Sequence, residues 1–274
     1  MSVQRYYDEL ERTPSHTRSL AMHRWLGVNR STSVHYELVR AELRRNMRTL
    51  QTFGGDPRVL DAGCGIAGAL LWFEEREPQW SLVGYTLSHE QAKYIATKLP
   101  AHRFKVKQRS FDELQMTFDG IYSIEAVHHS PDLNKTLRVW AEHLSPGGVI
   151  TIIDDFTADG ARVPKALENA FALFKQHWLA WSLLSPAQLA HMARPFGLRL
   201  VANRDLGTDY DVIGQNYLGP APSLPSTCIG GEEAVIRRRL SSDWHYTCGT
   251  TAKRILTVNR LLRYHQLTFV RVGR

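Results

Sequence analysis

The sequence predicts an α/β fold, in which a sheet of buried strands is flanked by helices. Apolar residues ending at Asp61 are followed by glycines at 63, 65 and 68, which is typical of a buried strand that turns sharply into a helix over 69–76. Short apolar segments at 81–86, 120–123 and 149–153 are separated by segments of helical periodicity. With 274 residues, 43% apolar and 22% charged, the chain can bury one large core with an appended cap.

The other elements are predicted from local signals. Residues 1–30 mix aromatic and charged side chains with breakers such as Pro14, which predicts short helices, and 35–50 carry apolar residues on one helical face. Helices are also predicted at 91–99, 171–184, 232–240 and 251–264. Another helix is predicted to begin with Ser130 as its N-cap and Pro131 in its first turn. Strands are predicted at 103–108, 198–204 and 266–272, and a loop at 219–231.

The glycine turn is predicted to bind a nucleotide. Glycine has no Cβ, so a ligand can contact the backbone there, and the N–H groups of the following helix point at it. The spacing also satisfies G-x-G-x-x-G, which on its own is compatible with a dinucleotide. Asp61 at the strand end favours a cationic ligand instead. A nicotinamide site would also need an acid at the end of the next strand, where the sequence has Thr86 and Leu87.

Four segments, in order, resemble a known enzyme family. Residues 59–65 (Val-Leu-Asp-Ala-Gly-Cys-Gly) are similar to motif I of the class I S-adenosylmethionine (SAM) methyltransferases, and 84–91, 118–126 and 144–150 resemble that family's later motifs. The resemblance covers residues 55–155 and points to the sterol, tocopherol, prenyl-diphosphate and cyclopropane-fatty-acid branch. It implies a Rossmann-like seven-stranded sheet with an antiparallel last strand and a helical cap. The implied organisation is a cap segment at 1–50, a SAM-binding core at 51–156, and the rest of the sheet with an inserted lid at 157–274.

The resemblance also implies which residues hold the cofactor. Asp61 and the glycines would hold SAM, and Ser110 and Phe111 lie where the family contacts adenine. In the branch whose second-strand segment is Gly-x-Thr-x-Ser-x-x-Gln, backbone and hydroxyl groups hold the ribose in place of an acid. The implied cofactor-binding residues are Asp61, Gly63, Cys64, Gly65, Thr86, Leu87, Gln91, Ser110, Phe111 and Ser123. The product would be S-adenosyl-L-homocysteine.

Glu125, His128 and His129 follow the fourth predicted strand, at the sheet edge where α/β proteins bind ligands. Glu125 and His129 resemble a Glu-Ala-x-x-His stretch of the family, which implies that the glutamate is the base that removes a proton after methyl addition. Contact with the SAM ammonium alone is the alternative for Glu125, and capping or lining the loop is the alternative for each histidine. The adjacent histidines are expected to point apart, and no third ligand has metal spacing.

Aromatic residues outside the cofactor motifs are predicted to line an acceptor pocket beneath the lid. An aromatic stripe at helical spacing is also typical of an ordinary hydrophobic core, and that alternative stays open. The candidates are Tyr7, Trp25, Phe171, Trp178, Trp181, Tyr210, Trp244 and Tyr246.

The net charge of +7 comes from the two ends of the chain, because residues 1–50 and 231–274 contribute +4 and +6 and the middle −3. This pattern is compatible with nucleic acid, with an anionic small substrate, or with solvated helix faces. No segment has the roughly 18 consecutive apolar residues of a membrane span, and 1–30 is too charged for a signal peptide. The three cysteines show no metal spacing, which favours a reduced, cytoplasmic protein.

The expected function is methyl transfer from SAM to carbon in a small apolar, isoprenoid-like acceptor of specialised metabolism, which can be diphosphorylated. A carbon acceptor leaves a cation that aromatic faces stabilise and a carboxylate deprotonates. The alternatives are O- or N-methylation of a small natural product, RNA methylation, and a cyclase or binding protein of this fold without methyl transfer. Magnesium is expected only with a diphosphate, nucleic acid is not an expected partner, and a homo-oligomer is left open.

Overall fold

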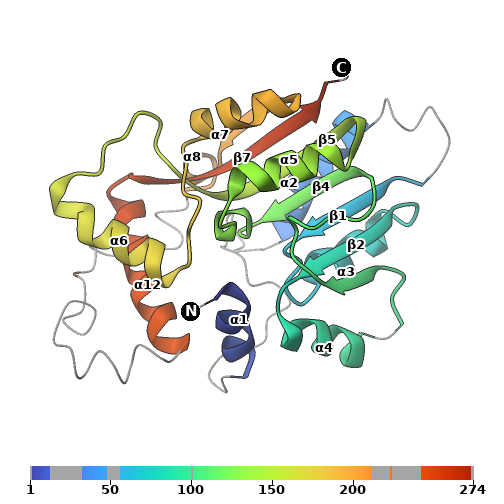
Figure 1. The fold of residues 1–274 in the computed structure, drawn as a ribbon, viewed down its shortest axis with the longest axis horizontal. Coiled ribbons are helices and arrows are strands. Elements are labelled where there is room, and N and C mark those ends of the chain that lie inside the picture. Colours follow the sequence, from blue (N-terminus) through green and yellow to red (C-terminus); the bar gives the residue numbers. More distant parts are fainter. Residues whose placement is uncertain are drawn as a thin grey trace.

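The computed structural model describes residues 2–12, 33–47, 56–99, 101–211, 223 and 242–272. Its seven-stranded sheet has the order β3-β2-β1-β4-β5-β7-β6, and only β7 runs antiparallel to its neighbours (Figure 1). The strands are β1 Arg58–Ala62, β2 Ser81–Thr86, β3 Lys105–Gln108, β4 Phe118–Ile124, β5 Leu144–Thr157, β6 Leu198–Asp205 and β7 Leu262–Arg271. The predicted α/β sheet with an antiparallel last strand is therefore confirmed.

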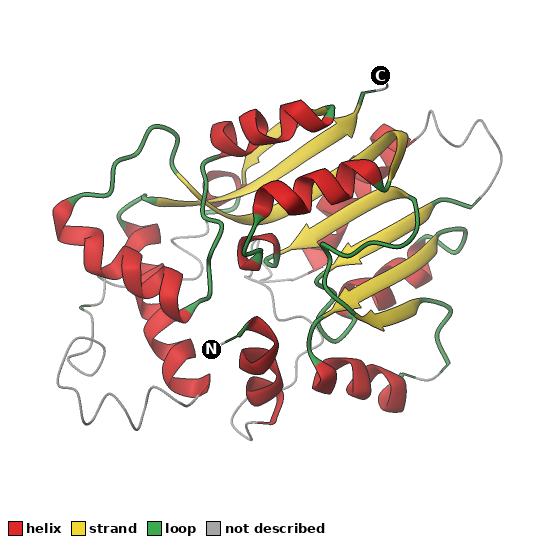
Figure 2. Ribbon diagram, in the orientation of Figure 1, coloured by secondary structure: helices red, strands yellow, loops and turns green. Residues whose placement is uncertain are grey.

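Helices cover both faces of the sheet (Figure 2). One face carries α2 (Ser33–Met47), α3 (Gly68–Arg76), α4 (His89–Lys98) and the short α8 (Leu206–Asp209). The other face carries α5 (Leu133–Glu142) and α7 (Pro186–Ala193). The apolar side chains of each helix layer bury against the strands, as amphipathic helices do on a sheet.

A third group of helices lies beyond one end of the sheet. There α6 (Glu168–His177) and α12 (Ser242–Val258) pack on each other, and α1 (Val3–Arg12) contacts both α12 and α4 (Figure 1). Tyr6 and Leu10 of α1 form a small buried cluster with Leu179. The two described helices of the segment 1–50 therefore lie in different places. α1 lies with this outer group of helices, whereas α2 packs on the sheet.

The helix boundaries predicted at Ser130 and Tyr264 are wrong. The N-cap of α5 is Asp132, whose side chain accepts from the N–H of Lys135, and the helix does not begin at Ser130. The helix predicted at 251–264 is α12, which ends at Val258, and Tyr264 lies in β7. The helix predicted at 232–240 lies outside the described residues, as does the loop at 219–231 apart from residue 223.

Within the described part of the chain, no helix has the length and apolar character needed to cross a membrane. Cys64 is a buried free thiol, whereas Cys248 on α12 is disulfide-bonded. The expectation of reduced cysteines is therefore wrong for Cys248.

Candidate active site

The glycine turn after β1 is shaped for close contact with a ligand. Gly63 has a φ of 98°, and a Cβ added to it would lie 2.5 Å from the Cβ of Ala126 in the loop after β4. Gly65 has a φ of 52°, and among the described residues nothing beyond its chain neighbours lies within 4 Å of an added Cβ. Both backbone conformations favour glycine. The turn therefore touches the loop after β4 on one side and has open space on the other.

Asp61 lies at the end of β1 and is 3% exposed. The hydroxyl of Tyr122 on β4 donates to its Oδ2 over 2.9 Å. Burial and the Asp61 charge together raise the pKa of Tyr122 well above its usual range. The same two causes raise the pKa of the Cys64 thiol. These neighbours therefore stay neutral beside the carboxylate, an arrangement that suits a cationic ligand.

The end of β2 forms a compact polar turn. The Thr86 hydroxyl donates to Oε1 of Gln91 over 2.7 Å and accepts from the N–H of Ser88 over 3.2 Å. Ser88 is the N-cap of α4, and its Oγ accepts from the N–H of Gln91 over 3.2 Å. Gln91 is only 4% exposed. The structure thus brings Thr86, Leu87 and Gln91 together in one turn next to the glycine turn.

The predicted adenine-side residues lie in the turn after β3. The Ser110 hydroxyl bonds the Asp112 carboxylate. The indole N–H of Trp140 donates to the carbonyl of Phe111 over 2.8 Å, and the two rings meet edge to face at 5.9 Å. On β4, Ser123 is fully buried, and its hydroxyl has no hydrogen-bond partner among the described residues. Buried hydroxyl groups are normally paired, so Ser123 stays a candidate ligand contact.

Glu125 follows β4 in a backbone conformation that side-chain-bearing residues rarely adopt, with a φ of 51°. Its N–H donates to the carbonyl of Ile153 over 2.8 Å, which ties the loop to β5. The Glu125 charge raises the pKa of both Tyr7 and His129. Backbone strain of this kind persists where the surroundings hold it, and it is concentrated at functional sites.

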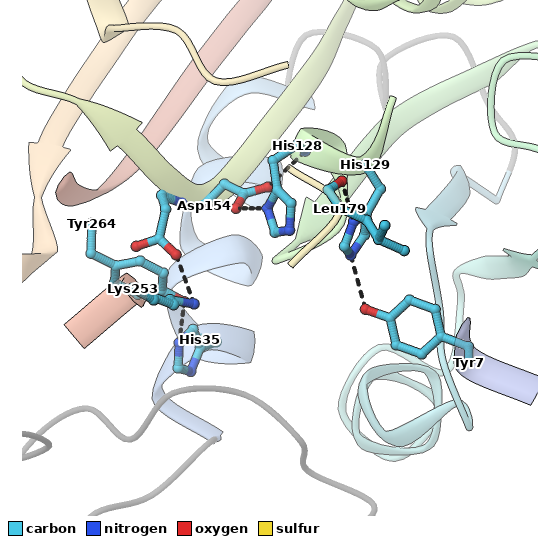
Figure 3. A network of polar contacts seen from close by, with 9 residues as sticks. Tyr7, His35, His128, His129, Asp154, Leu179, Lys253 and Tyr264 are labelled. Atoms are coloured by element: carbon cyan, nitrogen blue, oxygen red, sulfur yellow. Dashed lines mark hydrogen bonds and ion pairs between the residues drawn. The ribbon is translucent and has the colours of Figure 1, made fainter. Parts of the chain in front are cut away.

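His129 is held at both ring nitrogens (Figure 3). Its Nδ1 lies 3.1 Å from the carbonyl of Leu179, and its Nε2 lies 2.9 Å from the Tyr7 hydroxyl. Because a carbonyl only accepts, Nδ1 carries the proton and Tyr7 donates to Nε2. Leu179 reaches this place because α6 ends at His177 and the chain reverses at Leu179, with a φ of 55°. The helical spacing predicted through residue 184 is therefore wrong after His177.

Burial keeps this pair uncharged. It lowers the pKa of His129 well below the usual 6.5, with His128 adding to the effect and Leu179 and Glu125 opposing it. Burial, followed by the Glu125 charge, raises the pKa of Tyr7. Near neutral pH the contact is therefore a neutral hydroxyl donating to a neutral imidazole.

The depressed pKa of His129 predicts a pH-dependent stability. The unfolded chain binds a proton at this histidine below about pH 6.5 and the folded protein does not, so the free energy of unfolding should fall as pH falls. The slope reaches about 1.4 kcal/mol per pH unit for one group. Urea unfolding of the wild type and His129→Gln between about pH 7.5 and 5.5 measures it. Burial also lowers the pKa of His265, so the difference between the two proteins is the readout, and identical slopes would contradict the prediction.

His128 is oriented by Asp154 of β5, the residue after Ile153, where the pairing of β5 with β4 stops. Its Nδ1 bonds Oδ1 of Asp154, while its backbone N–H donates to Oδ2 over 3.2 Å (Figure 3). The carboxylate also accepts from the N–H of Asp155 over 2.8 Å. Because a carboxylate only accepts, Nδ1 of His128 carries a proton. Nε2 is buried and has no hydrogen-bond partner among the described residues.

The expectation that the two histidines point apart is wrong, because their rings meet edge to face with centroids 4.1 Å apart. They lie in the short 3₁₀ turn Val127–His129, which puts successive side chains closer than an extended loop would. Asp154 was missed by the sequence analysis. Its signal was available, since Asp154 and Asp155 directly follow the predicted strand 149–153 and parallel strands end at the same sheet edge. In the structure β5 continues to Thr157, but its pairing with β4 stops at Ile153.

Asp154→Asn is expected to lower the free energy of unfolding by about 1–3 kcal/mol, because an amide placed against three N–H donors leaves at least one of them unsatisfied in either orientation. Asp159→Asn is the control, because Asp159 accepts one exposed bond, from the N–H of Ala187 over 3.0 Å. Its effect should be below about 1 kcal/mol. Equal loss in the two variants, measured by urea unfolding, would refute the special position of Asp154.

The aromatic residues predicted to line a pocket are distributed over several places. Phe171 packs in the α6–α12 cluster, and Trp178 receives the Lys253 ammonium 4.8 Å from its ring centroid and meets Tyr246 at 5.7 Å. Trp181 and Tyr246 are 43% and 41% exposed. Tyr7 contacts a predicted catalytic residue, because its hydroxyl lies 2.9 Å from Nε2 of His129. Tyr210 lies beside Arg204 of the outer strand β6, and Trp25 and the Trp244 side chain are outside the described residues.

A buried ion pair joins the cap to the sheet at the same end. Nζ of Lys253 on α12 lies 2.7 Å from Oδ2 of Asp155, and both side chains are almost fully buried. Nearby, Nε2 of His35 lies 2.9 Å from the Tyr264 hydroxyl (Figure 3). Among the described residues no group of three or more His, Cys, Asp or Glu side chains could hold a metal ion.

Known proteins share parts of this chain and its fold. A trans-aconitate 2-methyltransferase of Deinococcus radiodurans is 38% identical over 97 residues, 35% of this chain and 36% of that protein. A 24-methylenesterol C-methyltransferase 2 of Oryza sativa subsp. japonica is 26% identical over 185 residues, 63% of this chain and 49% of that protein. The match thus spans about a third to a half of these relatives.

A solved structure of geranyl diphosphate C-methyltransferase from Streptomyces coelicolor A3(2), in complex with Mg²⁺, geranyl diphosphate and S-adenosyl-L-homocysteine, has the same fold. It superimposes with a TM-score of 0.67 at 14% identity, over 98% of this chain and 96% of that one. The family model described as "Methyltransferase domain" matches residues 35–203, more than half of the chain. That match includes the glycine turn, the turn after β2 and the loop carrying Glu125, so this chain belongs to the methyltransferase domain family.

Proposed function

We propose that the protein transfers the methyl group of SAM to a carbon atom of a small apolar, isoprenoid-like acceptor. The observation that carries the proposal is the contact between two loops, in which Gly63 of the cofactor turn packs against Ala126, the residue after Glu125. A ligand on the glycine turn would therefore lie next to a half-buried carboxylate. Two proteins described above, a structural neighbour named for geranyl diphosphate and a sequence relative named for a sterol, support the same acceptor class.

The residues of the β1 and β2 turns fit SAM. Asp61 offers a buried carboxylate to the cationic end of the cofactor, and the positive φ of Gly63 and Gly65 lets the backbone approach it. Thr86 and Gln91 present hydroxyl and amide groups for the ribose. When bound, SAM supplies an electrophilic methyl group on a sulfonium. The chain's own task is to align the acceptor with that group and to exclude water.

Glu125 is the proposed base. When the acceptor carbon forms its bond to the methyl group, the S–CH₃ bond breaks and the alkene loses its π pair, which leaves a positive charge on the neighbouring carbon. Glu125 takes a proton from the adjacent carbon, and the C–H pair restores the double bond. Its neighbours Tyr7 and His129 are neutral, so they do not oppose the cationic acceptor. Magnesium would enter only with a diphosphate acceptor.

The helices beyond the sheet are proposed to form the cap over the acceptor. α1 brings Tyr7 to His129, and α12 brings Lys253 to Asp155, so both ends of the chain meet the sheet edge that carries Glu125. The acceptor would lie between these groups. As part of this proposal, Phe171, Trp178, Trp181 and Tyr246 would contact the acceptor.

A hydroxyl or amine acceptor is the second candidate, because one observation favours it. His128 has a buried Nε2 with no hydrogen-bond partner among the described residues, while its Nδ1 is held by Asp154. This arrangement is typical of a general base for an O–H or N–H group. The two candidates differ in which residue removes the proton, Glu125 for carbon and His128 for oxygen or nitrogen.

Transfer of an isotopically labelled methyl from SAM to a panel of acceptors tests the proposal. The panel contains prenyl diphosphates, sterols, phenols, amines and transfer RNA, with and without magnesium, and product masses and fragments locate the label. Carbon-bound label on an isoprenoid is the expected result. Label on oxygen or nitrogen would favour the second candidate, and label on transfer RNA would overturn both.

A further inference from the structure

The end of β2 lacks the acid that a nucleotide ribose usually contacts, and α1 supplies one from a distant part of the chain. After β2 come Thr86, Leu87 and Ser88, none of which is acidic. Glu90, the next acid along the chain, forms an ion pair with Arg12, whose Nη2 lies 2.7 Å from Oε1 of Glu90. In contrast, Glu11 is 6% exposed, and its Oε1 accepts from Nε2 of Gln91 over 3.3 Å.

The side-chain amide of Gln91 is oriented by two hydrogen bonds, one to Thr86 and one to Glu11. Its Oε1 is occupied by the Thr86 hydroxyl at 2.7 Å, so its amide NH₂ faces Glu11. The turn therefore presents an N–H donor from Gln91 beside carboxylate acceptors from Glu11. Each ribose hydroxyl both donates and accepts, so a donor next to an acceptor is the set that such a diol requires.

The geometry of α1 places Glu11 at one end of the site and Tyr7 at the other. The two residues are four positions apart, on the same side of the helix. Tyr7 contacts His129 after β4, whereas Glu11 contacts Gln91 after β2. Asp8 on the same helix accepts from the Ser88 hydroxyl over 2.6 Å and from the N–H of Glu90 over 3.2 Å. The helix is thus fixed across the ends of β1, β2 and β4, where the cofactor is proposed to bind.

We propose that Glu11 accepts hydrogen bonds from the ribose hydroxyl groups of bound SAM, in place of the acid that is absent from the end of β2. This inference rests on the proposed function, because it assumes that SAM occupies the glycine turn. It makes α1 part of the cofactor site as well as of the cap. A cofactor held in this way cannot leave past α1 without breaking the Glu11 contact.

Calorimetric binding of S-adenosyl-L-homocysteine to the full chain tests the inference. Glu11→Gln removes the charge and keeps the size, and its dissociation constant should rise roughly tenfold to hundredfold, as expected for a lost charged hydrogen bond. Glu9→Gln is the matched control, because Glu9 is on the same helix and pairs with Arg5 at 2.6 Å. It should bind like the wild type.

Analogues lacking the 2′- or the 3′-hydroxyl separate ribose recognition from a structural role of Glu11. If Glu11 contacts a hydroxyl, the gap between wild type and Glu11→Gln should shrink to about threefold or less for the analogue that lacks it. Glu11→Asp, which keeps the charge, is compared with the same ligands in case Glu11→Gln unfolds. An unchanged affinity in Glu11→Gln, or a loss equal for all three ligands, overturns the inference and leaves Glu11 as a clamp between α1 and α4. Failure of the wild type to bind S-adenosyl-L-homocysteine overturns the proposed function itself.

Discussion

Gly63→Val should weaken SAM binding about hundredfold or more while the protein stays folded. A Cβ at this position would lie 2.5 Å from Ala126 Cβ, so either the glycine turn or the Glu125 loop must move. A β-branched residue is also strained at a φ of 98°. Isothermal titration with SAM measures the effect, and circular dichroism checks the fold.

Gly160→Val separates the two causes of that loss. Gly160 also has a positive φ, 67°, but among the described residues nothing beyond its neighbours lies within 4 Å of an added Cβ. This variant therefore carries the backbone strain, about 1–3 kcal/mol, without the clash. Its SAM affinity should equal that of the wild type. If Gly63→Val bound SAM equally well, the assignment of the glycine turn to the cofactor would be withdrawn.

The sheet could be predicted from the sequence because its signals are local. The apolar segments, the glycines at 63 and 65 and the turn after β2 each depend on a few neighbouring residues. The family resemblance implied the number of strands and the antiparallel direction of the last one. Helix ends were less predictable, because several residues compete for them. Ser130 has the chemistry of an N-cap, but its hydroxyl bonds that of Thr136 over 2.8 Å, and Asp132 caps the helix instead.

The candidate site was predictable in its parts but not in its contacts. Glu125, His128 and His129 were found because they follow a strand, yet their partners Tyr7, Asp154 and Leu179 come from α1, β5 and the segment after α6. Tyr7 and His129 are 122 positions apart. No local pattern encodes such a pairing, since it depends on how helices pack beyond the sheet. Asp154 is the exception, because it directly follows the predicted strand 149–153, and parallel strands end at the same sheet edge.

Glu125→Gln is expected to lower kcat about 10²–10⁴-fold if Glu125 is the base for a carbon acceptor. The amide keeps the size of the side chain and the backbone conformation of φ 51° but cannot take a proton. SAM affinity should change little, because the loss falls on the proton transfer and not on cofactor binding. Single-turnover transfer of labelled methyl, with SAM affinity measured in parallel, gives both quantities.

Glu113→Gln is the control, because Glu113 is an exposed glutamate in the turn after β3 and should retain wild-type turnover. The pattern of losses then decides between the roles of Glu125. A fall in kcat with unchanged SAM affinity supports the base, whereas a matching loss of SAM affinity supports contact with the cofactor's ammonium. Full activity in Glu125→Gln would end both roles and turn attention to His128, whose buried Nε2 has no hydrogen-bond partner among the described residues.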